Sequence, residues 1–251
     1  MQTIKEIAAA LKAATQYEAW MEEIQQDERT GVQKAWQQFL KRMDKKQRLQ
    51  QEHEAKIAFD AQFGQLVAGV DEAGRGPLAG PVVTAAVILP ENCQALLGLN
   101  DSKQLSKEAR EYMCTLVKKH ALSYSIHFQS AKIIDELNIY EATKQSMATS
   151  VETLKIKPNF VIVDAMTLPI KIPQQSIIKG DAKSLAIAAA SILAKTARDQ
   201  YMEELAQQFP QYGFEQHAGY GTKQHLEALS AYGPTLHHRA SFEPIKSMMK
   251  G

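Results

Sequence analysis

Cysteine is scarce in this chain of 251 residues, which contains only Cys93 and Cys114. Their spacing fits no metal-binding motif, and two cysteines cannot form the disulfide framework of a small secreted protein. A disulfide between them remains an alternative, but two buried thiols in a reducing compartment explain the composition more simply. We therefore expect a cytoplasmic protein.

Long apolar runs are also missing. The most apolar stretch, from Leu185 to Ala194, is far shorter than the ~20 residues that a membrane span needs. The N-terminus lacks the basic region and apolar run of a secretory signal. The net charge of +1 does not itself indicate a nucleic-acid partner. We expect no membrane association, and nothing in the sequence requires more than a monomer.

Residues 1–60 are poor in the residues that break helices, with one glycine, Gly31, and no proline. Two capping boxes are predicted, Thr3 with Glu6 and Thr15 with Glu18. Apolar residues at helical spacing predict two short helices followed by a long one. We therefore assign residues 1–60 to an all-helical N-terminal extension and residues 65–251 to a larger domain with a helical C-terminal part.

From residue 65 the pattern becomes α/β. Five apolar or alternating runs predict strands, at Val67–Val70, Val82–Leu89, Leu122–Phe128, Phe160–Val163 and Ser176–Ile178. Four periodic stretches predict helices, at Lys107–Lys119, Tyr140–Leu154, Ala182–Phe209 and Lys223–Tyr232. The early strands follow one another directly, whereas helices separate the later ones. The expected fold is a mixed five-stranded sheet flanked by helices.

Four acidic residues lie at the ends of predicted strands: Asp71, Glu72, Asp164 and Asp181. Carboxylates at such ends can converge although they are far apart in sequence. Oxygen ligands without Cys or His suit Mg²⁺ or Mn²⁺, and two such ions ~3.5–4 Å apart can promote hydrolysis of a phosphodiester. Taken singly, Asp181 is as well explained as a helix N-cap and Asp164 as the start of a turn.

Glu72 poses a geometric difficulty for such a site. Adjacent residues of a strand point to opposite faces of the sheet. For Asp71 and Glu72 to face one site, we expect the strand to bulge or turn at Glu72. The glycines that follow, Gly74 and Gly76, favour such a turn, and Arg75 between them offers a planar fork of donors for phosphate. The alternative is a tight turn with a solvated arginine.

At this point the sequence resembles a known family, the type 2 ribonucleases H, and specifically bacterial ribonuclease HII. The resemblance rests on Val70–Val83, which contains Asp-Glu-Ala-Gly-Arg-Gly, and on further segments in the family's order. These are Asn100–Ser106, Asp164, Lys179–Asp181, Ala188–Lys195, His217–Thr222 and His238–Phe242. The similarity covers roughly residues 65–245.

The resemblance implies a ribonuclease H-like catalytic domain whose metal-binding catalytic residues are Asp71, Glu72, Asp164 and Asp181. The implied enzyme hydrolyses the RNA strand of RNA–DNA hybrids. It also cuts 5′ of single ribonucleotides embedded in duplex DNA, leaving 5′-phosphate and 3′-hydroxyl ends. The implied cofactor is Mg²⁺ or Mn²⁺ at a two-metal site.

The resemblance also implies substrate contacts. Gly74, Arg75 and Gly76 would sense the 2′-hydroxyl, which distinguishes RNA from DNA. Tyr220 would stack on the sugar 3′ of the ribonucleotide, and Ser102 and Lys103 would contact phosphates. Without the resemblance, Tyr220 is better explained as a core or turn residue. Asp101 is expected to order its loop. No histidine is assigned as a general base, and a structural role is favoured for Arg239 and Phe242.

The extension contains a basic segment. Residues 29–48 hold seven basic side chains against one acid, Asp44. They could contact a phosphate backbone, although a solvated helix face explains them equally well. The whole chain has two alternative functions. One is a ribonuclease HIII-like enzyme that acts on hybrids only, against which Gly74–Gly76, Tyr220 and the helical extension argue. The other is a non-catalytic nucleic-acid-binding module, against which the four acids argue.

Overall fold

The structure is a computed structural model that describes residues 2–99 and 105–249. The chain divides into two compact units, Met1–Glu54 and Ala55–Gly251. The first unit contains α1 (Ile4–Ala13), α2 (Met21–Gln25) and most of α3 (Thr30–Ala61), so the two short helices and the long helix are confirmed.

The two predicted capping boxes had different outcomes. Thr3 and Glu6 form theirs, with the Thr3 N–H donating to Glu6 over 2.7 Å. The second was wrong, because α2 begins after Trp20, whose side chain makes no cap. Trp20 instead donates its indole N–H to Glu18.

The core of the first unit comes from the apolar stripes of its three helices. Its buried side chains are Ile7, Leu11, Met21, Ile24, Val32, Trp36 and Phe39. Trp36 stacks on Phe39 with ring centroids 5.4 Å apart. Arg42, one turn further along α3, donates to the carbonyls of Leu11 and Ala14 at 2.7 Å each, and so satisfies the C-terminal end of α1.

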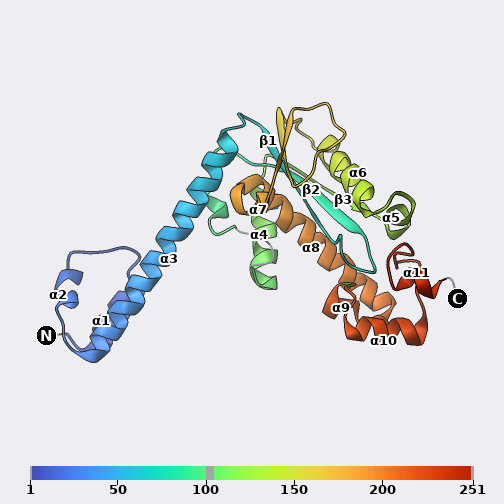
Figure 1. The fold of residues 1–251 in the computed structure, drawn as a ribbon. Coiled ribbons are helices and arrows are strands. Elements are labelled where there is room, and N and C mark those ends of the chain that lie inside the picture. The colour runs from blue at the N-terminus through green and yellow to red at the C-terminus, as the bar shows by residue number, and fades with distance from the viewer. Residues whose placement is uncertain (1, 100–104, 250–251) are drawn as a thin grey trace. The chain divides into compact units, whose positions relative to one another are not determined.

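The second unit is built on a mixed five-stranded sheet with the strand order β3-β2-β1-β4-β5. Figure 1 labels β1, β2 and β3 in this sheet. Its strands are β1 (Val67–Ala73), β2 (Val82–Ile88), β3 (Ser123–Gln129), β4 (Phe160–Asp164) and β5 (Gln174–Ile177). β1, β2 and β3 pair antiparallel, whereas β1, β4 and β5 pair parallel. The predicted fold class is confirmed.

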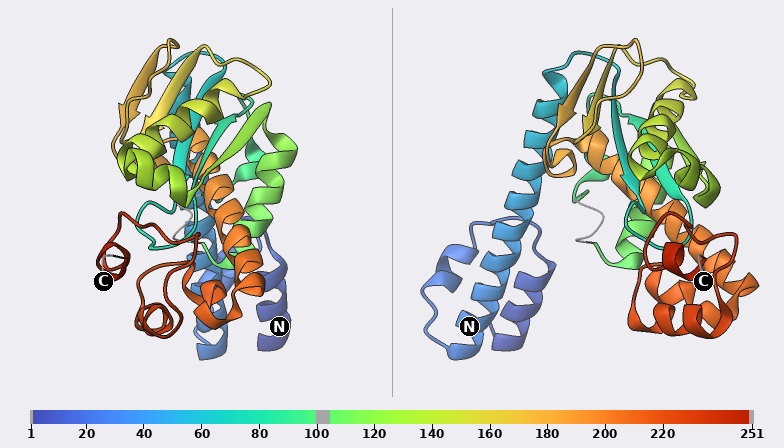
Figure 2. Two further views of the ribbon diagram at one scale, coloured as in Figure 1. Left: turned by 90° about the vertical axis from the view of Figure 1, so that its right-hand side faces the viewer. Right: turned by 45° about the vertical axis from the view of Figure 1, so that its right-hand side comes forward.

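Helices cover both faces of this sheet (Figure 2). On one face α8 (Leu185–Gln208) packs against β1 and β2, and α4 (Lys107–His120) packs against α8. On the other face lie α6 (Ile139–Glu152) and, beside it, α5 (Ala131–Leu137). Every residue of β2 is buried, which explains why its sequence is apolar except at Thr84.

Several elements differ from expectation. β1 continues three residues beyond Val70, and β5 begins two residues before Ser176. The predicted helix Ala182–Phe209 is two helices, α7 (Gly180–Lys183) and α8. They separate at Ser184, which is extended and caps α8 by accepting from the Ile187 N–H. The sequence reading also missed α5, which Ser130 caps in the same way.

Past α8 the chain forms a compact helical region. It comprises a 3₁₀ turn (Pro210–Tyr212), α9 (Phe214–His217), α10 (Lys223–Tyr232) and α11 (Ile245–Met248), and another 3₁₀ turn lies at Gln94–Leu96. Cys93 and Cys114 are buried free thiols, as expected. Over residues 2–99 and 105–249, no helix is both long and apolar enough to cross a membrane.

Candidate functional site

The sheet register brings two of the predicted acids together. Val70 of β1 pairs in parallel with Val163 of β4, so Asp71 and Asp164, one position further along each strand, are neighbours. Val70 and Val163 both pack in the core under α6. Because side chains alternate between faces, Asp71 and Asp164 both point to the α8 face. Ser191 of α8 hydrogen-bonds the buried Asp71 carboxylate there.

Glu72 does not lie where the sequence reading required. The register Asp71↔Ala85, Glu72↔Thr84 is continuous, so the expected bulge or turn at Glu72 was wrong. Thr84, opposite Glu72, hydrogen-bonds Ser146 and Ser150 of α6 over 2.8 and 2.7 Å. Glu72 therefore starts from the opposite face to Asp71. β4 pairs with β1 only as far as Val70, so Glu72 lies beyond the part of β1 that β4 covers.

Burial and mutual repulsion raise the pKa values of Asp71 and Glu72. The pKa of Asp71 is raised well above its usual range, mainly by burial and then by the negative charges of Glu72 and Asp164. Burial also raises the pKa of Glu72, although Arg75 opposes this shift from 3.4 Å. Three carboxylates thus repel one another where little water screens their charges. A bound cation would relieve this repulsion.

The fourth acid, Asp181, reaches this place through Gly180. The Gly180 N–H donates to Oδ1 of Asp164 over 2.7 Å. A Cβ at Gly180 would lie 3.2 Å from that oxygen and 2.6 Å from Cδ1 of Ile187, so only glycine lets α7 come this close. Asp181 follows directly. It is not the N-cap of α7, a position that Lys179 occupies.

The donor set fits a hard divalent cation by its chemistry, since it contains only carboxylate oxygens. The side chains do not yet form a coordination shell: among the described residues, no three His, Cys, Asp or Glu side chains are arranged to hold a metal ion. The backbone supplies the proximity, through β1, β4 and α7. Side-chain rotation would have to complete the arrangement.

The glycine turn after β1 rests on two buried arginines. Arg239, which is 0% exposed, donates to the carbonyls of Gly74, Arg75 and Gly80 at 2.5–3.1 Å. Arg198 of α8 donates to the carbonyls of Ala79 and Pro81 at 3.1 and 3.0 Å. Burial lowers the pKa of Arg239 to about 9 and that of Arg198 to about 10. The sequence reading favoured a structural role for Arg239, but it missed Arg198, which has no local signal.

These contacts orient the peptide groups of the turn. A trans peptide directs its C=O and N–H to opposite sides. The Gly74 and Arg75 carbonyls point inward to Arg239, so the N–H groups of Arg75 and Gly76 point outward. Within the described part of the chain, neither N–H donates to a protein acceptor. The turn therefore presents two backbone donors next to Glu72.

Tyr220 lies beside this turn. Its side chain is 47% exposed, and a Cβ on Gly76 would lie 3.6 Å from its Cε1. The ring is thus neither a core residue nor remote from Gly76. Two other predicted contact residues, Ser102 and Lys103, lie outside the described residues.

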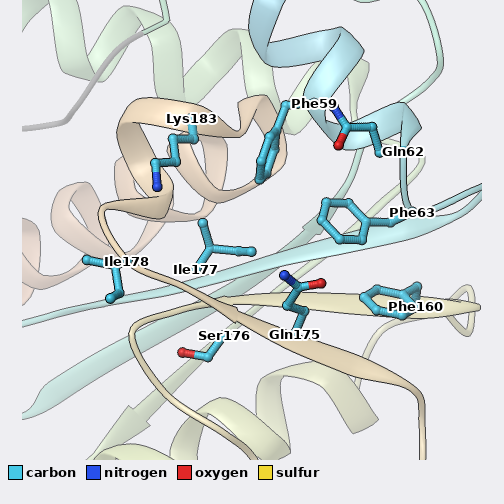
Figure 3. Close-up of a pocket in the computed structure, with 9 residues that line it drawn as sticks. All are labelled: Phe59, Gln62, Phe63, Phe160, Gln175, Ser176, Ile177, Ile178 and Lys183. Atoms are coloured by element: carbon cyan, nitrogen blue, oxygen red, sulfur yellow. The ribbon is translucent and has the colours of Figure 1, made fainter.

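A cavity of about 710 Å³ is lined by none of the four acids (Figure 3). Its wall includes Phe59 of α3, Phe63 just after that helix, Phe160 of β4 and Lys183 of α7. Phe63 stacks on Phe160 with centroids 5.2 Å apart. Cavity size alone would therefore not have located the acids.

Two protein-family models match this chain. The model described as ribonuclease HII matches residues 68–245, and the model described as ribonuclease HII N-terminal domain matches residues 3–64. Ribonuclease HII of Halalkalibacterium halodurans is 50% identical over 250 residues, which cover 97% of this chain and 95% of the relative. That of Lactobacillus helveticus is 48% identical, with 99% of this chain and 100% of the relative covered.

Solved structures agree with the family models. The ribonuclease H2 from Pyrococcus horikoshii OT3 superposes with a TM-score of 0.65 at 30% identity, covering 73% of this chain and 97% of that chain. Bst-RNase HIII in complex with Mn²⁺ shares the fold, with a TM-score of 0.57 at 19% identity, covering 76% of this chain and 72% of that chain. The chain therefore belongs to the ribonuclease HII family and is an endoribonuclease that acts on RNA–DNA hybrids.

Proposed function

We propose that this enzyme cuts 5′ of single ribonucleotides embedded in duplex DNA, in addition to the RNA strand of hybrids, and leaves 5′-phosphate and 3′-hydroxyl ends. The observation that carries the proposal is the glycine turn. Its outward N–H groups, at Arg75 and Gly76, come from the same segment as Asp71 and Glu72. A donor pair of this kind can test a single 2′-hydroxyl without needing a long RNA strand.

Asp71, Glu72, Asp164 and Asp181 would hold Mg²⁺ or Mn²⁺. When bound, divalent ions of this kind activate the attacking water and stabilise the leaving oxygen. The protein's own contribution is to hold the acids in place. The Gly180 N–H keeps Oδ1 of Asp164 oriented, and Ser191 does the same for Asp71. Arg75, at 3.4 Å from Glu72, can exchange that partner for a phosphate oxygen.

Tyr220 would stack on the sugar that follows the ribonucleotide. Its exposure and its closeness to Gly76 support this role, because the same substrate segment could then contact both. The ribonuclease HIII-like alternative predicts hybrid cleavage alone. Ser102 and Lys103 remain proposed phosphate contacts on the strength of the family resemblance.

The N-terminal unit would add phosphate contacts. Four of the seven basic residues in its segment 29–48 have intramolecular partners: Arg29 with Asp27, Arg48 with Asp44, and Arg42 and Lys46 with carbonyls of the α1 region. The other three are Lys34, Lys41 and Lys45, all exposed. Their spacing of seven and four positions puts them on one face of α3, opposite the buried stripe of Val32, Trp36 and Phe39. A lysine stripe of this kind suits sequence-independent contact with a nucleic-acid backbone.

Two substrates test the proposal. A duplex DNA with one ribonucleotide and a full RNA–DNA hybrid are incubated separately with Mg²⁺ or Mn²⁺, and the product ends are identified. We expect both to be cut, with 5′-phosphate and 3′-hydroxyl ends. Cleavage of the hybrid alone would support the HIII-like alternative instead.

Asp164→Asn is the matched variant for the acids. Asn retains an oxygen that can accept from the Gly180 N–H, so the fold should persist while cleavage is abolished. Wild-type activity would remove Asp164 from the site. For the extension, replacing Lys34, Lys41 and Lys45 by Gln should reduce the salt dependence of substrate binding. The same change at the exposed Lys155 and Lys157 serves as its control.

A further inference from the structure

Three histidines from the C-terminal region lie buried behind Tyr220. They are His217 of α9, His225 of α10 and His238, which follows α10. Tyr212 and Phe214 pack around them, with the Phe214 ring centroid 5.4 Å from that of His225. Nothing in the cleavage chemistry described above uses these histidines, although their ring nitrogens are hydrogen-bonded to one another and to the backbone.

The hydrogen bonds fix which nitrogen carries each proton. The Thr235 N–H donates to Nδ1 of His238 over 2.9 Å, so that nitrogen is an acceptor. Neutral His238 then carries its proton on Nε2, which lies 3.1 Å from Nε2 of His225. His225 must accept there, and its own proton lies on Nδ1. That N–H points to the Tyr220 carbonyl, 2.9 Å away.

The result is a directed chain of hydrogen bonds from Thr235 through His238 and His225 to the backbone of Tyr220. His217 supports the neighbouring residue in the same manner. It accepts from the Gly219 N–H on Nδ1 and so donates from Nε2 to the Tyr212 carbonyl, 2.8 Å away. The rings of His217 and His225 stack, with centroids 4.7 Å apart. Both peptide groups that flank the Tyr220 amide are thereby held by histidines.

Electrostatics agree with this assignment. Burial lowers the pKa of His225, and burial together with the neighbouring His225 lowers that of His238 to about 4. Both rings are therefore neutral at pH 7. A second proton on either ring would place a donor against a donor, either at the paired Nε2 atoms or against the Thr235 N–H.

We infer that His225, supported by His238, is a positioning residue that fixes Tyr220 and so sets how strongly the enzyme discriminates at the junction between a ribonucleotide and DNA. The inference rests on the proposed role of Tyr220. His225 acts through the tyrosine backbone and not on the scissile phosphate. The Tyr220 carbonyl also accepts from the Thr222 N–H over 2.8 Å, so removing the Nδ1–H of His225 takes away one of its two donors and loosens the segment that presents the ring.

The test compares cleavage of the single-ribonucleotide duplex with cleavage of the hybrid. His225→Phe keeps the ring shape but removes both nitrogens. We expect kcat/KM on the single-ribonucleotide duplex to fall about tenfold relative to the hybrid. His225→Asn should restore the ratio, because the Asn amide can donate from nearly the position of Nδ1. His127→Phe is the control, since it also removes a partly buried hydrogen bond, to Ser146 of α6, and should leave the ratio unchanged.

A double-mutant cycle with Tyr220→Ala separates the two hypotheses. If Tyr220→Ala leaves the ratio unchanged, the proposed function of Tyr220 fails. If Tyr220→Ala changes the ratio but His225→Phe does not, or if the effect of His225→Phe persists undiminished without the tyrosine ring, the positioning role fails.

The tautomers can be measured on the wild-type protein without any variant. Nitrogen NMR should show His238 protonated on Nε2 and His225 protonated on Nδ1. A His225 ring protonated on Nε2 would overturn the chain of hydrogen bonds, even if the His225→Phe variant failed to fold.

Discussion

A Cβ on Gly74 would lie 1.9 Å from Nε of Arg198. The glycine turn and the buried guanidinium therefore fit each other only because residue 74 has no side chain. The φ angle of Gly74 is +91°, and a residue with a side chain adopts this angle only with strain. The buried Arg198 thus restricts the conformation of the turn that bears the proposed 2′-hydroxyl donors.

Gly74→Ala should lower the free energy of unfolding by about 3 kcal/mol or more, because backbone strain and overpacking add. Gly64→Ala is the control, since Gly64 has a φ of +94° and nothing within 4 Å of a Cβ. It should show only the strain, about 1–3 kcal/mol. Urea unfolding of both variants measures the difference. Equal losses would mean that Arg198 moves away without cost.

Arg239→Lys keeps a positive charge but lacks the planar fork of donors with which Arg239 reaches three separate carbonyls. We expect a loss of about 2–4 kcal/mol in unfolding free energy together with a higher KM, since the Gly74 and Arg75 peptides become free to rotate. Arg42→Lys is matched, because Arg42 also bonds two backbone carbonyls, though in the N-terminal unit. It should leave kcat unchanged. An unaltered KM in Arg239→Lys would show that the turn keeps its peptide orientation unaided.

Asp71→Asn should abolish cleavage and stabilise the metal-free protein. Burial and repulsion from Glu72 and Asp164 disfavour the ionised Asp71 in the fold, and the amide removes that charge. Each kcal/mol of relieved repulsion raises Tm by about 2–4 °C. A calorimetric Tm below wild type in the presence of a chelator would contradict this. Mg²⁺ at a hundred times its Kd should stabilise wild type by about 2.7 kcal/mol and Asp71→Asn by much less.

Deletion of residues 1–54 should leave the catalytic activity intact, whereas deletion of residues 1–60 should not. Lys56 donates to the Asp181 carbonyl at 3.3 Å, and Asp60 accepts from the Ala186 N–H at the start of α8. A chain beginning at residue 55 should keep its kcat and bind substrate more weakly, with a smaller salt dependence. A chain beginning at residue 61 should lose kcat and stability as well. Identical behaviour of the two truncations would argue against a role for Lys56 and Asp60.

Acid should destabilise the protein partly through His238. Its pKa falls from about 6.5 in the unfolded chain to about 4 in the fold, so the unfolded state takes up the proton first. This contribution to stability is complete above pH 6.5 and is lost as the pH falls towards 4. Unfolding free energies at pH 7, 5.5 and 4.5 should decline less steeply in His238→Gln than in wild type. Parallel curves would exclude His238 as a contributor.

The sequence allowed the sheet and the three-helix extension to be predicted, because each has a local pattern, whereas the assignment of the four acids to a metal site stays a prediction. It misplaced the end of β1, since the polar pair Asp71 and Glu72 reads as the start of a loop. The structure keeps both in the strand through pairing with Ala85 and Thr84. Arg198 and the link between His225 and His238 could not be predicted. Their meaning depends on partners, such as Pro81 and Tyr220, that only the tertiary fold identifies.

The outward peptide groups at Arg75 and Gly76 have a consequence for attempts to alter which sugar the enzyme accepts. The groups proposed to recognise the 2′-hydroxyl are main-chain N–H groups, and these have the same chemistry whichever residue carries them. Substitutions within the turn can abolish recognition but offer few ways to redirect it. The adjustable parts lie underneath, in the two guanidinium groups of Arg198 and Arg239 that set the tilt of those peptides. A search for altered sugar preference should therefore begin in the interior of the protein.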